Sequence, residues 1–229
     1  MNNYSRYAVF HTPPEGILAQ KAAQWLGWDP VSGLAPAPPA LDELPGSNRK
    51  LTARPRKYGF HGTLRPPFRP AQGVTLGSLR DMTDDLARNL SPVTLDRVSV
   101  ASLGSFLAFR PVGETRPLTE LAAQVIEATN TWRAPLSAEE RAKRNPDRLN
   151  PQQRALLDQW GYPFVMEAFQ FHMTLTGPLR RDVREQLQPV LTRYFEGCVP
   201  SPYPISDLCL MGEADDGRFH LLSRHPLGG

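Results

Sequence analysis

The stretch Phe60-His61-Gly62-Thr63-Leu64 decides how this sequence folds, and it recurs as Phe171-His172-Met173-Thr174-Leu175. Both copies read Phe-His-x-Thr-Leu. Because successive side chains of a β-strand point to opposite faces, the histidine and the threonine of each copy share one face. The phenylalanine and the leucine share the other. We therefore expect two strands, over residues 58–64 and 168–176, each anchored through its apolar face.

The segments that follow the two copies match in order. After the first copy come two prolines, a helical pattern near residues 74–90, a strand, a turn and a second strand that ends at Pro111. After the second copy come Gly177-Pro178, a helical pattern near residues 181–195 and two strands joined by a turn. Because proline has no N–H to donate to a ladder, it is expected to end each motif strand. The repeat predicts two similar lobes of sheet plus helix, related by a pseudo-twofold axis, with the motif strands meeting across a cleft.

The composition is that of a globular protein. Of the 229 residues, 40% are hydrophobic, so the chain can bury a sizeable core. We expect one bilobal domain over residues 1–229, with a long proline-rich loop over 29–57 and a helical insertion over 132–162. No apolar run approaches a membrane span, the N-terminus lacks signal-peptide architecture, and the two cysteines have no zinc or redox spacing. These features indicate a cytoplasmic protein with no membrane partner and no evident obligate protein partner.

The charge is mildly positive. A net charge of +3 permits an anionic substrate but is too small to indicate a surface that coats nucleic acid. A basic run, Arg49-Lys50, Arg54 and Arg56-Lys57, ends the proline-rich loop just before the first motif. Two interpretations stay open for this run: a solvated loop, or a basic lip that attracts a phosphorylated substrate.

Two motif faces that meet would bring together two imidazoles and two hydroxyls. One neutral imidazole can take a proton from water while a protonated partner gives one to a leaving oxygen, and the hydroxyls can hold phosphate oxygens. The set suits a phosphodiester, with His61 and His172 as acid and base and Thr63 and Thr174 as phosphate-binding groups. Arg65 lies on the same strand face as His61 and can add a charged contact.

Other side chains have weaker support. Tyr58, Phe106, Tyr162 and Phe219 can stack on a base or a sugar, or can simply pack in the core. Two histidines without a carboxylate in either motif make a poor metal-ligand set, so we expect no metal and no other cofactor. The remaining histidines lack a motif: His11 and His220 are expected to be structural, and His225 is expected to lie near a frayed end.

These residues resemble the 2H phosphoesterase superfamily, which is named for two His-x-Thr/Ser motifs in a duplicated fold. The match is His61-Gly62-Thr63 and His172-Met173-Thr174. Within it the sequence is similar to a branch of unknown function found with phosphonate-utilisation (carbon–phosphorus lyase) operons. The segments that carry this finer resemblance are Arg6-Tyr7-Ala8, Tyr58-Gly59-Phe60-His61, Pro66-Pro67-Phe68, Phe106-Leu107-Ala108, Arg133-Ala134-Pro135-Leu136-Ser137, Gln153-Arg154-Ala155-Leu156-Leu157 and Trp160-Gly161-Tyr162-Pro163.

The resemblance implies an α+β, bilobal fold with antiparallel sheets flanking a central cleft and helices packed outside. It also implies metal-independent chemistry on cyclic or 2′–5′ phosphodiesters, with His61 and His172 as the acid/base pair and Thr63 and Thr174 on the phosphate. Our leading hypothesis is hydrolysis of a cyclic phosphodiester on a small phosphorylated sugar or nucleotide. Two alternatives are an enzyme that acts on RNA ends or 2′–5′ linkages, and a binding module without catalysis. The sequence leaves open which histidine is the base.

Overall fold

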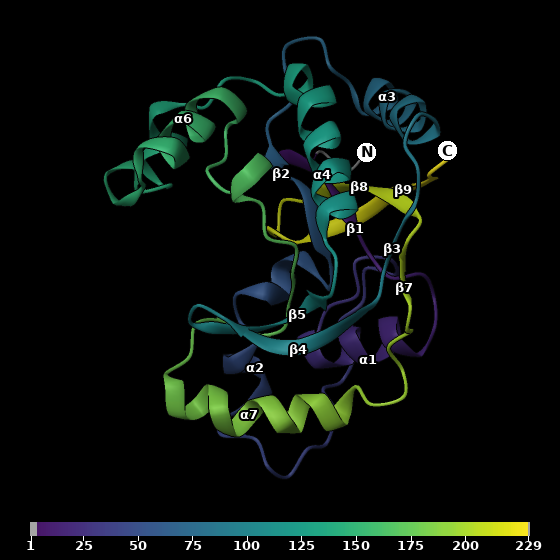
Figure 1. Cartoon of the computed structure of the whole chain (residues 1–229), viewed down its shortest axis with the longest axis vertical. Helices are drawn as coiled ribbons and strands as arrows, with labels where there is room; N and C mark the ends of the chain where they lie inside the picture. The colour runs from purple at the N-terminus through teal and green to yellow at the C-terminus, as the bar shows by residue number, and fades with distance from the viewer. Residues whose placement is uncertain (1–3, 229) are drawn as a thin grey trace.

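The computed structural model describes residues 4–228, so residues 1–3 and 229 of the expected domain lie outside the described residues. Its centre is one seven-stranded sheet with the strand order β4-β5-β6-β2-β1-β8-β9, in which all neighbours are antiparallel. Two short strands, β3 and β7, form a separate antiparallel pair (Figure 1). The strands are β1 (Arg6–His11), β2 (Gly62–Phe68), β3 (Val93–Leu95), β4 (Arg97–Leu103), β5 (Phe106–Val112), β6 (Met173–Thr174), β7 (Tyr203–Ile205), β8 (Asp207–Glu213) and β9 (Phe219–Pro226).

Helices pack around this sheet, which makes the fold α+β with antiparallel sheets, as expected. The longer helices are α1 (Ile17–Leu26), α3 (Leu76–Arg88), α4 (Arg116–Ala128), α6 (Pro151–Trp160) and α7 (Arg181–Tyr194). The short ones are α2 (Asn48–Leu51), α5 (Ala138–Ala142) and the 3-10 turns η1 (Pro55–Tyr58), η2 (Asn130–Trp132), η3 (Pro146–Arg148) and η4 (Met166–Ala168). Within residues 4–228 no helix has the length and apolar character that crossing a membrane requires.

The element order after each motif is the same. Strand β2 is followed by α3, β3, β4 and β5, and β6 is followed by α7, β7, β8 and β9. The helices exchange partners between these halves: α3 packs on β8 and β9, whereas α7 packs on β4 and β5 (Figure 1). The two predicted helices near 74–90 and 181–195 are confirmed.

The motif strands are neighbours inside one sheet, joined at Gly62 and Met173. The prediction that prolines end the first strand was wrong, because β2 continues through Pro66 and Pro67 to Phe68. The prolines are tolerated for two reasons. The strand β6 has already left β2 at that point, and the pairing with β1 is irregular between Tyr7 and Val9, opposite the prolines. A proline at a bulge with one neighbouring strand leaves no ladder hydrogen bond unmade.

The second motif strand is much shorter than expected. Only Met173 and Thr174 belong to β6; Ala168 ends η4, and residues 169–172 form no regular secondary structure. Beyond Thr174 the backbone leaves the ladder, because the N–H groups of Leu175 and Thr176 both donate to the carbonyl of Leu107. The motif nevertheless keeps its expected alternation of buried and half-buried side chains.

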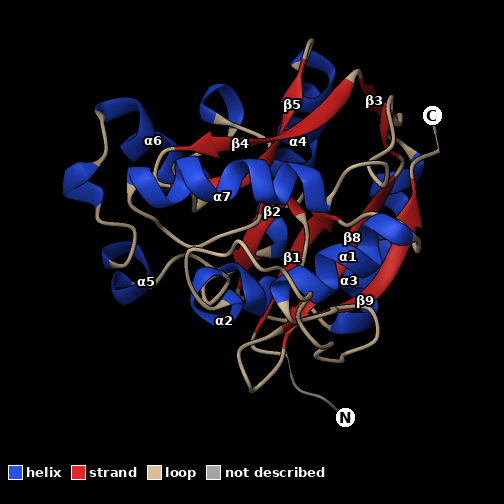
Figure 2. Ribbon diagram, turned by 90° about the horizontal axis from the view of Figure 1, so that it is seen from below, coloured by secondary structure: helices blue, strands red, loops and turns tan. Residues whose placement is uncertain are grey.

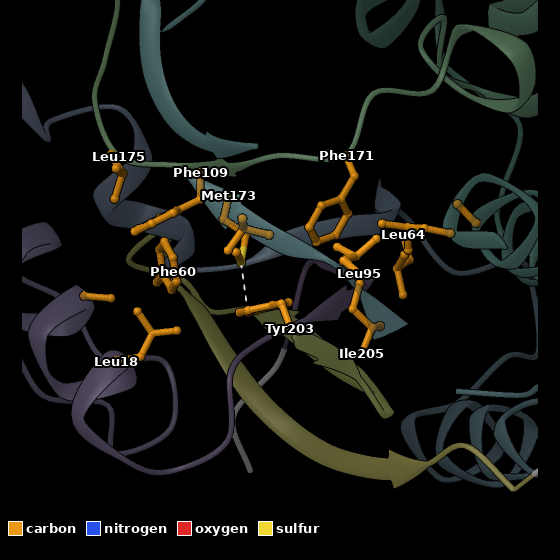
Figure 3. Close-up of a cluster of buried hydrophobic side chains, with 14 of the residues drawn as sticks. Leu18, Phe60, Leu64, Leu95, Phe109, Phe171, Met173, Leu175, Tyr203 and Ile205 are labelled. Atoms are coloured by element: carbon orange, nitrogen blue, oxygen red, sulfur yellow. Dashed lines mark hydrogen bonds between the residues drawn. The ribbon is translucent and has the colours of Figure 1, made fainter. Parts of the chain in front are cut away.

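The apolar faces of the two motifs build the centre of the core. Phe60, Leu64, Phe171 and Leu175 are all at most 5% exposed. Figure 3 shows these four side chains, with Met173, gathered over Tyr203 from β7. The Tyr203 hydroxyl donates to the Met173 sulfur at 3.4 Å. Burying these side chains stabilises the fold and fixes the register in which the opposite, polar face is presented.

Two segments differ in detail from the sequence expectation. The stretch 29–57, expected as one loop, contains α2 and most of η1. Side chains fix this helical part, because the Asn48 amide donates to the Trp25 carbonyl and the Thr52 hydroxyl donates to the Asn48 carbonyl. The stretch 132–162 contains α5, η3 and α6, which lie together at one end of the molecule (Figure 2).

Candidate functional site

His61 stands directly before β2, and its ring is held on two sides. Its Nδ1 lies 2.9 Å from the Gly59 carbonyl oxygen, to which it donates. Phe10 from β1 stacks on the imidazole at 4.0 Å between ring centroids, and Tyr58 tilts over it at 5.6 Å. Gly59 has a φ of 72°, and an added Cβ there would lie 2.6 Å from the Pro30 ring, so glycine makes this turn possible. The turn brings the Gly59 carbonyl back to the imidazole.

His172 is held in the same way. Its Nδ1 donates to the Gln170 carbonyl at 2.7 Å, again two residues earlier in the chain. The ring of Phe106 lies 5.6 Å away. A carbonyl can only accept, so Nδ1 carries the proton in both histidines, and Nε2 of each neutral ring carries the lone pair. Both motifs thus present Nε2 as the atom available for proton transfer.

The threonines accompany the histidines on the polar face of the motifs. The Thr63 hydroxyl lies 3.2 Å from His61 Nε2 and donates to it when the ring is neutral. Thr174 lies opposite Ala108 of β5, next to Met173, which joins β6 to β2. All four polar motif residues are half-buried, whereas the residues between them are buried. The predicted sharing of faces is therefore confirmed.

These side chains line two adjoining cavities. The first, here called the motif chamber, has a volume of about 480 Å³ and is lined by His61, Thr63 and Thr174. The second, the apolar chamber, has about the same volume and is lined by His172 together with Thr63 and mostly apolar side chains. Residues common to both walls are Thr63, Pro66, Phe106, Tyr162 and Phe164. The two histidines therefore face adjoining cavities, and the ring of His172 is near enough to lower the pKa of His61.

Burial shapes the charge of both histidines. It lowers the pKa of His61 to about 4, against the opposing hydrogen bond to Gly59, and the nearby rings of His172 and His11 lower it further. Burial also lowers the pKa of His172, helped by the charge of Arg110 and opposed by the bond to Gln170. Both rings are therefore neutral at pH 7. An anion bound between them would favour the imidazolium form of either ring.

The other expected site residues are brought to the same region, with one displacement. Tyr58 lines the motif chamber and stacks on Phe219, which is itself fully buried and packs in the core. Phe106 and Tyr162 line both the motif and the apolar chamber. Arg65 is buried and does not line the motif chamber but a third, neighbouring cavity. Its guanidinium is thus separated from the phosphate position that the strand alternation suggested.

The residues of the basic run before the first motif differ in their surroundings: some line cavities at the site, and others are exposed to solvent. Arg54 and Lys57 line cavities at the site, whereas Arg49 and Lys50 are exposed away from the three cavities. Arg56 is occupied structurally, because its Nε donates to the Leu26 carbonyl. Sequence reasoning missed Phe10, Arg144 and Phe164, which all line the motif chamber. The first two carried no motif signal, although the exposed Phe164 follows the Gly161-Tyr162-Pro163 turn that the family resemblance includes.

The remaining histidines have structural roles where contacts show them. His11 is buried, and its Nε2 lies 2.9 Å from the Tyr203 hydroxyl. The expectation that His225 lies near a frayed end was wrong. It is buried in β9 and contacts Ser223 and Asp84, because β9 is held by β8 and covered by α3. Among residues 4–228, no group of three or more His, Cys, Asp or Glu side chains gathers in a way that could hold a metal.

Comparison with known proteins places the chain in a family. Residues 63–220 match the model of a family described as protein of unknown function, DUF1045. The chain is 36% identical over 235 residues to ribose 1,5-bisphosphate phosphokinase PhnN from Janthinobacterium sp. (strain Marseille), covering 98% of this chain and 51% of that protein. It is 30% identical over 221 residues to the protein of the same name from Laribacter hongkongensis (strain HLHK9), covering 96% of this chain and again 51% of the relative.

The chain thus spans about half the length of the curated relatives it matches. Among solved structures, it is similar to E. coli LigT complexed with 3′-AMP, with 12% identity, a TM-score of 0.43, and coverage of 99% of this chain and 100% of that one. The family match extends over more than half of the sequence and includes the whole second motif, but only Thr63 and Leu64 of the first. It confirms the resemblance to a branch of unknown function, and the chain belongs to the DUF1045 family.

Proposed function

We propose that this chain is a metal-independent phosphodiesterase that opens a small cyclic phosphodiester on a phosphorylated ribose or a nucleotide. The proposal rests on one observation: the two histidine rings are fixed by equivalent hydrogen bonds to the backbone. Each Nδ1 is fixed on the carbonyl two residues earlier, so each Nε2 is left for proton transfer, in the motif chamber for His61 and in the adjoining apolar chamber for His172. Two available Nε2 atoms beside two threonine hydroxyls are what an acid/base pair on a phosphodiester needs.

The proposed reaction balances without a further reactant. A neutral imidazole takes a proton from water through Nε2 while the water oxygen forms a bond to phosphorus. The bond between phosphorus and the sugar oxygen breaks, and the imidazolium of the other motif gives its Nε2 proton to that oxygen. When substrate binds, the Thr63 hydroxyl turns from His61 Nε2 to the substrate, and the hydroxyls of Thr63 and Thr174 donate to non-bridging oxygens, which gain charge during the step. Exchange of protons with solvent then restores the pair.

The repeated element order supports a duplicated origin for this arrangement. We infer that β2 to β5 and β6 to β9 are two copies of one unit, and that the exchange of α3 and α7 joins them. A pseudo-twofold relation between the copies would place the two Nε2 atoms on opposite sides of a substrate in a central cleft. That placement suits in-line displacement, in which the attacking and leaving oxygens lie on opposite sides of phosphorus.

The names of the curated relatives support a phosphorylated ribose as the substrate, and the resemblance to the phosphonate-operon branch supports a role in phosphonate metabolism. Their printed activity is a phosphokinase. The chain spans only half of each relative, and its sequence contains no Gly-x-x-x-x-Gly-Lys-Ser/Thr loop to hold triphosphate. We therefore assign phosphodiester cleavage, and not phosphate transfer from a nucleoside triphosphate, to this chain.

The test is turnover by the purified protein in the presence of a chelator. The panel contains 2′,3′-cyclic nucleotides, ribose 1,2-cyclic phosphate 5-phosphate and a 2′–5′ dinucleotide. We expect cleavage of a cyclic substrate, and we expect His61→Asn and His172→Asn each to lower kcat by about 10²- to 10⁴-fold. His220→Asn is the matched control, because that histidine lies against Trp28 and lines none of the three cavities.

Other outcomes separate the alternatives. Cleavage of the 2′–5′ dinucleotide alone would favour the enzyme that processes RNA ends or 2′–5′ linkages. Binding of the cyclic compounds without cleavage would favour a binding module. Turnover above one tenth of the wild-type value in either motif variant, or activity that the chelator abolishes, would refute the proposed mechanism.

A further inference from the structure

A third cavity, here called the basic chamber, adjoins the motif chamber. Its volume is about 610 Å³, and its walls carry eight arginine or lysine side chains and a single carboxylate, Glu140. It shares Arg6, Arg54, Tyr58, Pro66, Pro67 and Arg144 with the motif chamber, so the two cavities lie side by side. This cavity plays no part in the proton transfers described above.

Three of the eight cations are already neutralised by carboxylates. The pairs are Arg6 with Glu213, Arg69 with Glu140 and Lys143 with Glu139. The single carboxylate in the wall is therefore held by Arg69, through two hydrogen bonds of 2.8 Å.

The other five cations make no ion pair with any carboxylate of residues 4–228. They are Arg54, Lys57, Arg65, Arg133 and Arg144. Three of them lie over aromatic rings: Lys57 over Tyr58 at 4.6 Å, Arg144 over Tyr162 at 4.9 Å and Arg65 over Phe68 at 5.5 Å. Arg133 donates only to neutral oxygens, which are those of Asn130, Ala134 and Gln159. The chamber is therefore strongly cationic, although the chain as a whole carries only +3.

Arg65 is the most unusual of these cations. Its side chain comes from the centre of the fold, only 1% of the residue is exposed, and it lines the basic chamber. Its Nε and Nη1 are buried and have no hydrogen-bond partner within the described chain. Burial and the charge of Arg133 lower the pKa of Arg65 to about 9. A buried guanidinium whose Nε and Nη1 lack acceptors is costly, and a bound anion offsets that cost by accepting hydrogen bonds from these groups.

The position of Arg65 fits one ligand that reaches both chambers. Thr63 and Arg65 are two residues apart near the start of β2, which separates their Cα atoms by roughly 7 Å. An anionic group near Arg65 is therefore close to the scissile phosphate but distinct from it. A phosphorylated sugar provides two such groups on one small molecule.

We propose that the basic chamber is a second anion subsite, centred on Arg65, that binds a terminal phosphomonoester of the substrate whose phosphodiester lies in the motif chamber. This inference rests on the proposed function and names the substrate class more closely: a cyclic phosphodiester that carries a separate phosphate. Arg65 and Arg54 bind that phosphate, and the choice among cyclic phosphodiesters depends on it.

Matched substrate pairs test the subsite. The pairs are ribose 1,2-cyclic phosphate with and without a 5-phosphate, and uridine 2′,3′-cyclic phosphate with and without a 5′-phosphate. We expect the wild type to show a kcat/KM at least tenfold higher for the phosphorylated member of a pair. Loss of one charged hydrogen-bonding partner should lower that ratio about ten- to hundredfold in Arg65→Met.

Arg65 is buried, so Arg65→Met can disturb folding; two variants at exposed arginines provide a test that does not depend on that substitution. Arg54 is exposed and unpaired within the described chain, so Arg54→Gln should fold and should lower the ratio as well. Arg116→Gln, on the exposed start of α4, should leave the ratio unchanged. A wild type that does not distinguish the members of a pair would overturn the proposal. The proposal would also be overturned if Arg65→Met and Arg54→Gln lowered kcat/KM equally for the phosphorylated and the unphosphorylated member of a pair.

A binding measurement separates failure of the subsite from failure of the proposed function. If no member of either pair is cleaved, the proposed function fails, and calorimetric titration with ribose 5-phosphate decides the subsite alone. At least tenfold weaker binding to Arg65→Met would support it, whereas no binding or equal affinity would overturn it. If inorganic phosphate bound as tightly as ribose 5-phosphate, the basic chamber would be a site for the free anion. That result would overturn the role of the chamber in substrate choice.

Discussion

Gly62 of the first motif packs against Phe171 of the second, and this contact leads to a sharp prediction for Gly62→Ala. A Cβ added at Gly62 would lie less than 3.0 Å from Cε2 and Cζ of Phe171 and 3.3 Å from Cδ2. Phe171 is 5% exposed and packed into the core (Figure 3), so its ring has little room to move. Overpacking a core by one methyl group costs about 1–3 kcal/mol. For a chain of this size that corresponds to a Tm lower by roughly 2–12 °C.

Gly46→Ala is the matched control for this substitution. An added Cβ at Gly46 meets nothing within 4 Å, and neither glycine has a positive φ. Both substitutions reduce the entropy of the unfolded chain alike, which favours folding by about 0.4–1 kcal/mol. We therefore expect Gly46→Ala to be as stable as the wild type or slightly more stable. The difference between the two variants, measured by urea unfolding, reports the contact with Phe171.

A second substitution identifies the contact partner. In Gly62→Ala/Phe171→Leu the shorter side chain should relieve the overlap, so the loss of stability should be smaller than the sum of the two single losses by about 0.5–3 kcal/mol. Additivity within about 0.5 kcal/mol would show that Phe171 is not the obstacle. A Gly62→Ala variant as stable as Gly46→Ala would refute the whole argument, including the close packing of the two motifs.

Two further predictions concern buried charge. Arg224 forms an ion pair of 2.6 Å with Asp207, whose side chain is only 10% exposed. Arg224→Met should therefore lower the free energy of unfolding by about 3 kcal/mol in urea titrations, and a loss below about 1 kcal/mol would contradict the role of this pair. Burial lowers the pKa values of His11 and His61 to about 4, below the ordinary value of 6.5. Unfolding at pH 5 should therefore take up about one proton for each. The stability they contribute is complete above pH 6.5 and declines as the pH falls toward 4, by about 1.4 kcal/mol per pH unit and proton. Equal free energies of unfolding at pH 7 and pH 5 would contradict these shifts.

The motif itself was readable because its alternation of side chains is local. Phe60 and Leu64 are buried while His61 and Thr63 are half-buried, as the two-residue period of an extended chain requires. The helices α3 and α7 were readable for the same reason, since each repeats apolar residues at helical spacing. The sequence does not predict that α3 and α7 exchange partners between the halves, because this exchange depends on packing between segments far apart in the sequence.

The errors have physical reasons as well. The ladder rule for proline assumes two neighbouring strands, but at Pro66 and Pro67 β2 has one neighbour and a bulge. For Arg65, alternation along the strand predicts the face of the side chain but not the cavity that it reaches, which is the basic chamber. Pro66 and Pro67 of this strand line both the motif chamber and the basic chamber.

The two histidines are fixed by equivalent hydrogen bonds but lie in different surroundings, and these two features have different consequences for the reaction. Both histidines are held alike, so the repeat supplies a pair of equivalent Nε2 atoms but no difference between them. The differences come from outside the repeat: Phe10 stacks on His61, whereas His172 lines the apolar chamber. The basic chamber shares six wall residues with the motif chamber but only Pro66 with the apolar chamber. A substrate anchored there would approach the histidines in one orientation. The unpaired cations around Arg65, and not the duplicated motif, would then decide which imidazole meets water and which meets the leaving oxygen.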